Sequence, residues 1–247
     1  MLITKKKSLF SVLLLIAIST NVCAEDKKEE AFTISKVATE SKQSQMTPKQ
    51  ALKRLKEGNE RFLNNKLLQR NYLAQAKQSS YGQFPWVVVL NCMDSRSVPE
   101  FIFDQGLADM FTLRVAGNIL NEDILGSLEF ATKAAGARLI VVLGHTSCGA
   151  VRGACEGVQL GHLNHVLDQI SPLVEPAKKD SGLSSCSKPE LVNLIAKDNA
   201  LHVAREIQQQ SPIIQNLITN GQVGIVAGMH DIRTGKVTFF EEGRLIP

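Results

Sequence analysis

The sequence has 247 residues, of which 44% are apolar and 21% are charged, and its formal net charge is +4 at pH 7. A chain of this length and apolar content can bury the core of one folded domain. The basic residues do not cluster into the charged face that a nucleic-acid partner requires, so the composition argues against nucleic-acid binding.

The first 24 residues are typical of a secretory signal peptide. Lys5, Lys6 and Lys7 precede an apolar run over residues 9–18, and Val22 and Ala24 are small residues at the cleavage positions. The run is shorter than the roughly 20 apolar residues that span a bilayer, so we expect no membrane anchor after processing. We predict cleavage after Ala24, export to the periplasm, and a mature net charge of +1 because three lysines are removed.

Residues 25–45 are rich in Lys, Glu, Ser and Gln, a composition that predicts a flexible leader. A helix is predicted to begin at Thr47-Pro48, an N-cap residue followed by proline at the first helical position, and to end near Asn64. Its apolar residues Leu52, Leu55 and Phe62 fall on one stripe. This helix extends the N-terminal side of a single folded domain that we place over residues 46–247.

Short apolar, β-branched runs follow along the chain and predict strands. Runs without polar alternation indicate strands that are covered on both faces, as in a parallel sheet with flanking helices. We expect such strands at residues 86–90, 110–115, 139–143 and 223–227, and an edge strand at 236–240. Helical patterns lie at about 122–135, 162–177 and 189–210, with a polar loop at 178–188. The predicted fold is α/β, with a mostly parallel central sheet of four to five strands flanked by helices.

Chemically reactive side chains follow two of these strands. Cys92 comes directly after the first strand, and His145 and Cys148 follow the strand at residues 139–143. In open parallel sheets, sites form beyond the carboxyl ends of the strands. Two thiolates and one imidazole nitrogen suit zinc, and three protein ligands leave its fourth position open, as in catalytic sites. The simpler interpretation is two small buried core cysteines and a histidine that caps a loop.

Asp94 and Arg96 lie two and four residues after Cys92, where they can pair across a tight loop beside the metal. The carboxylate can accept a hydrogen bond from zinc-bound hydroxide, or it can occupy the open zinc position itself in a closed form. Arginine holds the carboxylate ionised and selects between these two states. The alternative is an exposed ion pair of little energetic value.

The motif Cys92-x-Asp94-x-Arg96 together with His145-x-x-Cys148 resembles that of the β-class carbonic anhydrases, in particular an exported bacterial type. The resemblance runs from about residue 46 to the C-terminus and includes the stretches at 51–62, 111–118 and 228–235.

The resemblance implies reversible hydration of carbon dioxide to bicarbonate and a proton on zinc-bound hydroxide, with one Zn²⁺ per subunit. It also implies a homodimer or homotetramer with sites near the subunit interface. Gln83 matches the substrate-orienting glutamine of the family, and Phe111 and Phe130 match the aromatic residues of its carbon dioxide pocket. Val89 stands where a bicarbonate-regulated subgroup has tryptophan, which implies a zinc open to water.

Three other functions remain compatible with the ligands. They are a zinc hydrolase of carbon disulfide or carbonyl sulfide, a non-catalytic zinc-binding module in which Asp94 closes the site, and an enzyme with Cys92 as its nucleophile.

The remaining histidines and cysteines are weaker candidates. His162 and His165 have a metal-binding spacing without a nearby acidic or sulfur ligand, so we interpret them as ordinary helix residues. Cys155 and Cys186 could form a disulfide in an oxidising compartment, but one follows the zinc loop closely and the other lies in a polar loop, so we favour unpaired cysteines. The sequence does not give the distance between them and leaves the pairing open.

Overall fold

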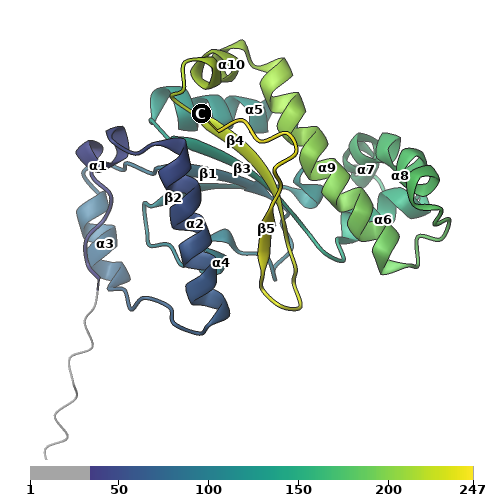
Figure 1. The fold of residues 1–247 in the computed structure, drawn as a ribbon, viewed down its shortest axis with the longest axis horizontal. Helices are drawn as coiled ribbons and strands as arrows, with labels where there is room; N and C mark the ends of the chain where they lie inside the picture. Colours follow the sequence, from purple (N-terminus) through teal and green to yellow (C-terminus); the bar gives the residue numbers. More distant parts are fainter. Residues whose placement is uncertain (1–33, 247) are drawn as a thin grey trace, which may run out of the picture. The chain divides into compact units, whose positions relative to one another are not determined.

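The computed structural model describes residues 34–246, drawn in colour in Figure 1. The predicted signal peptide and residues 25–33 of the predicted leader lie outside the described residues. Among the residues that are described, no helix is long and apolar enough to cross a bilayer.

Five strands form one sheet in the order β2-β1-β3-β4-β5, with the first four parallel and β5 antiparallel to β4. Every residue of β1 and β3 is buried, as their unbroken apolar sequences predict. All five predicted strands are confirmed, and β5 lies at an edge as expected. The strands are β1 (Val87–Asn91), β2 (Met110–Arg114), β3 (Leu139–His145), β4 (Gly224–His230) and β5 (Val237–Phe239).

Helices and short helical turns connect and cover these strands. They are α1 (Glu40–Ser44), α2 (Pro48–Leu63), α3 (Tyr72–Ser79), α4 (Pro99–Ile102), η1 (Ala116–Asn118), α5 (Glu122–Glu129), η2 (Phe130–Ala134), α6 (Gly149–Glu156), α7 (Leu163–Ile170), η3 (Ser171–Leu173), α8 (Val174–Ser181), α9 (Pro189–Gln210) and α10 (Pro212–Thr219).

The sheet is covered on both faces, which confirms the α/β prediction (Figure 1). Alternate residues of β1 point to opposite faces. Val87 and Val89 pack in the cluster that contains Leu55 of α2, whereas Val88 and Leu90 pack in the cluster that contains residues of α5, α9 and α10. A third apolar cluster joins α6, α7, α8 and α9 beyond the carboxyl ends of the strands.

The predicted helix boundaries hold where the capping signals are strong. Thr47 and Gln50 form a capping box at the start of α2, and Asn64 caps its other end. Helix α9 has the predicted bounds. The helix predicted over 162–177 is instead divided into α7, η3 and α8, because Pro172 in η3 has no N–H to continue the ladder. Helix α8 then runs on to Ser181, into the segment predicted as a loop.

The prediction of a flexible leader up to residue 45 is wrong for residues 34–45. The backbone of Ile34 pairs with that of Arg70, and Thr39 caps helix α1. Gln43 is only 6% exposed, and its side-chain amide donates to the carbonyl oxygens of Pro85 and Ala135. Composition did not predict this order because it depends on one residue. The amide of Gln43 donates to two loop carbonyl oxygens that would otherwise have no donor, and these bonds attach the segment to the domain.

Helix α2 lies against the end of α4 through Gly58. A Cβ atom at this position would lie 1.8 Å from the carbonyl oxygen of Phe103. The neighbouring Asn59 donates to the carbonyl oxygens of Ile102 and Gly235, so the helix has little freedom to move away.

We therefore predict that Gly58→Ala lowers the free energy of unfolding by about 2 kcal/mol or more, measured by urea denaturation. The matched control is Gly126→Ala in α5, where no atom lies within 4 Å of the added methyl group. Alanine is the better helix former, so this control should gain about 0.5–1 kcal/mol. Equal effects of the two substitutions would contradict the close approach.

Candidate metal centre

Parallel pairing of β1 with β3 brings the three predicted metal ligands together. Asn91, the last residue of β1, is in register with Leu143, so Cys92 follows at the same edge of the sheet as His145. Cys148 lies at the N-cap of α6. The three ligand atoms all lie within 4.8 Å of one another, and the two Sγ atoms are 3.9 Å apart. The predicted juxtaposition of ligands 53 residues apart is confirmed.

The His145 ring is oriented as a metal ligand. Its Nδ1 lies 3.0 Å from the carbonyl oxygen of Thr146, and because a carbonyl only accepts, Nδ1 carries the proton. The ring is fully buried, and Nε2 has no hydrogen-bond partner. A buried nitrogen with a free lone pair is costly unless something binds it, and a metal ion on the thiol side is such a partner.

The close approach of the two thiols moves their pKa values in opposite directions. The hydrogen bond from the Cys148 thiol lowers the pKa of Cys92, with further help from His145 and from the backbone N–H of Gly117, while burial opposes the shift. The same contact and burial raise the pKa of Cys148. Burial lowers the pKa of His145, but Cys92, the Thr146 carbonyl and Asp94 together outweigh burial, so the net shift is upward.

This donor set fits zinc. Two sulfurs and one imidazole nitrogen are ligands that zinc prefers, and two thiolates neutralise its charge in a buried site. All three side chains are at most 5% exposed, so water competes little for their ligand atoms.

Asp94 and Arg96 form a bidentate pair beside the cluster. Arg96 Nε and Nη2 donate to the two carboxylate oxygens of Asp94 at 2.9 and 2.7 Å, and the Arg96 backbone N–H donates to the first of these. The guanidinium holds the pKa of Asp94 well below its usual range. Asp94 Oδ2 lies 3.9 Å from His145 Nε2, so an ionised carboxylate stands next to the ligands while arginine retains it.

Backbone groups that the motif did not reveal support the ligands. Gly117 donates its N–H to Cys92 Sγ at 3.4 Å, and its φ of 68° and its contact with Ile170 leave no room for a side chain. Ser147 also has a positive φ, and Asn193 of α9 accepts its N–H at 2.8 Å. The only sequence signal for Gly117 is its place in the family-like stretch at 111–118.

The three predicted substrate-pocket residues do not join the cluster within one chain. Gln83 is exposed and precedes β1, at the end of the sheet opposite to Cys92. Phe111 is in register with Val88 and makes an edge contact with Phe130, whose side chain is 58% exposed. Val88 lies four residues before Cys92, or roughly 13 Å along an extended strand.

The weaker histidine candidates stay apart from the cluster. His162 and His165 are exposed at the start of α7. Within residues 34–246, Cys92, His145 and Cys148 form the one group of three side chains that could hold a metal ion. His230 of β4 is in register with His145 and is buried. Burial lowers the pKa of His230 to about 4, and the nearby His145 adds to the shift, so the His230 ring is neutral at pH 7.

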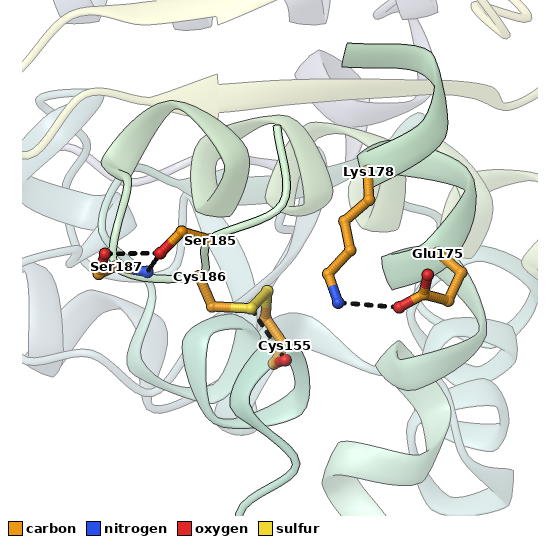
Figure 2. The surroundings of a disulfide bond; sticks show 6 residues. All are labelled: Cys155, Glu175, Lys178, Ser185, Cys186 and Ser187. Atoms are coloured by element: carbon orange, nitrogen blue, oxygen red, sulfur yellow. Dashed lines mark hydrogen bonds and ion pairs between the residues drawn. A yellow bond between two sulfur atoms is a disulfide. The ribbon is translucent and has the colours of Figure 1, made fainter. Parts of the chain in front are cut away.

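Cys155 and Cys186 form a disulfide, which answers the question that the sequence left open, against the interpretation that we favoured. Figure 2 shows the bond between α6 and the loop that precedes α9, close to the ion pair of Lys178 with Glu175. The fold of α6–α9 brings together two residues 31 positions apart, and a sequence does not give that distance. The bond fixes the helix whose first turn follows the ligand Cys148.

A family model described as "Carbonic anhydrase" matches residues 87–237, which include all three ligands and the Asp94–Arg96 pair. The chain is 35% identical over 195 residues to carbonic anhydrase 2 of Mycobacterium tuberculosis, which covers 76% of this chain and 91% of that protein. It is 35% identical over 199 residues to the carbonic anhydrase of Mycolicibacterium smegmatis, a match that covers 77% of this chain and 92% of that protein. The fold is similar to that of a tetrameric β-carbonic anhydrase from Sordaria macrospora, with a TM-score of 0.62, 22% identity, and coverage of 69% of this chain and 90% of that one.

We predict that the two cysteine pairs respond differently to substitution. Cys148→Ser should lose bound zinc, because a hydroxyl replaces one of two thiolate ligands. The matched control is the double variant Cys155→Ser/Cys186→Ser, which should keep one zinc per chain. Removal of the disulfide should instead lower the free energy of unfolding by about 3–4 kcal/mol, as expected for a closed loop of this length.

Metal content by atomic absorption and stability by urea denaturation separate the two effects. Full zinc in purified Cys148→Ser, or zinc loss in a folded disulfide variant, would contradict the assignment of ligands.

Proposed function

The chain belongs to the β-class carbonic anhydrase family, and we propose that it catalyses the reversible hydration of carbon dioxide to bicarbonate and a proton at one zinc ion. The observation that carries this proposal is the buried cluster of Cys92, His145 and Cys148 beside an ion-paired carboxylate. Both features lie within the part of the chain that matches the family model.

The chemistry of the metal sets the roles of the protein side chains. Zinc bound by three protein ligands would supply a Lewis acid that lowers the pKa of a water molecule towards neutrality. The two sulfurs and the imidazole hold the ion, and the hydrogen bond from His145 Nδ1 to the Thr146 carbonyl fixes the ring that offers Nε2.

Asp94 orients the nucleophile in this proposal. Its carboxylate lies beside the metal ligands, stays ionised, and can accept a hydrogen bond from the attacking oxygen. Arg96 holds both carboxylate oxygens and so keeps Asp94 from the fourth metal position.

Val89 is fully buried in β1. Since this residue replaces the tryptophan of the regulated subgroup, we favour a site open to water.

Gln83, Phe111 and Phe130 serve the site of a second subunit in our proposal. All three lie away from the metal ligands of their own chain, and β2 leaves one edge of the sheet unpaired. Large apolar side chains are exposed around Gln83 and the start of β2, including Tyr81, Leu107 and Phe101. A homodimer or homotetramer would cover these side chains, and the related Sordaria macrospora enzymes are tetrameric.

Subunit mixing tests this arrangement. Gln83→Ala should lose about tenfold or more in kcat/KM, because the substrate loses its amide donor. Co-assembly of Gln83→Ala with the zinc-free, inactive Cys148→Ser variant should raise kcat/KM above that of Gln83→Ala alone. The first chain supplies an intact metal site and the second an intact glutamine. Absence of such complementation in verified mixed oligomers would refute the shared site.

Export to the periplasm is also part of our proposal. The N-terminal 24 residues have the signal-peptide pattern, and the Cys155–Cys186 bond suits an oxidising compartment. N-terminal sequencing of the protein recovered from the periplasm should begin at Glu25, and recovery of an uncleaved chain in the cytoplasm would refute this.

Stopped-flow carbon dioxide hydration tests the function directly. The wild type with full zinc should accelerate hydration, whereas Asp94→Asn should keep its zinc but lose about 100-fold in kcat, since the oxygen is no longer oriented. Asp180→Asn, at an exposed position of α8, is the matched control and should behave as the wild type. Negligible hydration by fully zinc-loaded wild type would overturn the proposal, and parallel assays with carbon disulfide and carbonyl sulfide would then identify a hydrolase.

A further inference from the structure

We propose that Ser97 and His230 are positioning residues that hold the Asp94–Arg96 loop in the state in which arginine retains the carboxylate. The inference deepens the proposed function and rests on it. It is carried by a buried hydrogen-bond network beneath the loop, which joins β1, the loop and β4.

Ser97 is a fully buried junction of this network. Its N–H donates to the carbonyl oxygen of Asp94 at 2.9 Å, which closes the turn that contains Arg96. Its own carbonyl oxygen accepts from Asn91 Nδ2 at 2.8 Å. Its hydroxyl lies 3.1 Å from His230 Nδ1. One serine thus connects the catalytic turn to two adjoining regions of the sheet edge.

His230 anchors the network to the metal edge of the sheet. It ends β4 in register with His145, and its carbonyl oxygen accepts the N–H of Thr146 at 2.9 Å. His230 is only 2% exposed, so its ring is held in place by the side chains packed around it. The same residue therefore supports the His145 segment through its backbone and the Asp94 loop through its ring.

The loop needs this support because the carboxylate is so close to the ligands. Asp94 Oδ2 lies 3.9 Å from His145 Nε2, so a small shift of the turn would allow the carboxylate to reach a metal ion there. Arg96 holds the carboxylate through two hydrogen bonds, but its side chain is 55% exposed and these bonds do not fix the backbone of the turn. Arg114 holds the Asp94 carbonyl oxygen at 2.6 Å from the β2 side. Ser97 and His230 provide the buried restraint.

The test uses the full-length protein as it is produced, with Ser97→Ala to remove the hydroxyl and His230→Leu to remove its partner. The conservative variant His230→Asn keeps a hydrogen-bonding atom near the position of Nδ1. We expect both removals to lower kcat/KM about tenfold at pH 7, the size of one lost hydrogen bond. The midpoint of the rise in kcat/KM with pH should move upward, because a carboxylate at the metal must first be displaced. His230→Asn should recover most of the loss.

A spectroscopic cycle separates positioning from general destabilisation. In Co²⁺-substituted protein at pH 7, Ser97→Ala should change the visible absorption spectrum, since the ligand at the fourth position differs. Adding Ser97→Ala to Asp94→Asn should change neither the spectrum nor kcat further, because the effect acts through Asp94. The matched control is Ser211→Ala, which removes another fully buried serine hydroxyl, at the N-cap of α10. It should lower stability and leave the spectrum and pH profile unchanged.

A wild-type pH profile and spectrum in Ser97→Ala would overturn the inference, as would full additivity with Asp94→Asn. Loss of carbon dioxide hydration in the wild type would instead refute the proposed function, while the Co²⁺ spectra would still report on the position of Asp94.

Discussion

The parallel pairing of β1 with β3 is the constraint on which the site depends. It places Cys92 and His145 at one edge of the sheet, and the turn into α6 adds Cys148. A register shift of one residue would move the side chains of β1 from one packed face of the sheet to the other, so the packing of both apolar clusters fixes the ligand geometry as well as the fold. The core clusters on the two faces of the sheet therefore hold the metal site in place without touching the metal.

The electrostatics of the site follow from burial. Two thiolates with almost no solvent contact repel each other, and their contact lowers the pKa of Cys92 while it raises the pKa of Cys148. A dication changes this balance because it favours both thiolates. The Asp94–Arg96 pair adds a carboxylate with its own counter-charge, so a negative oxygen stands 3.9 Å from His145 Nε2 while arginine retains it.

The sequence predicted what is determined by local pattern. Unbroken apolar runs predicted five strands, and Thr47-Pro48 predicted the start of α2. The ligands were predictable because they follow strands that adjoin. Features that depend on tertiary distance were not: the Cys155–Cys186 bond, the docking of Gln43, and the Ser97–His230 contact each join residues far apart in the chain. The roles of Gln83, Phe111 and Phe130 came from the family resemblance alone, and within one chain these residues lie away from the metal.

Maturation of this enzyme requires that one particular pair of cysteines forms a disulfide while another pair stays reduced. Cys92 and Cys148 have to stay reduced, yet their sulfurs are only 3.9 Å apart. Among the four cysteines of the described chain, the pair Cys155 and Cys186 is the one single bond that spares both metal thiols. Cys155 lies two turns after Cys148 in α6. A disulfide from Cys155 to Cys148 or to Cys92 would therefore remove one of the metal-binding thiols. Folding of α6 against the loop before α9 therefore brings the pair that does not bind metal together, and a metal ion held by Cys92 and Cys148 would keep these two thiolates from pairing.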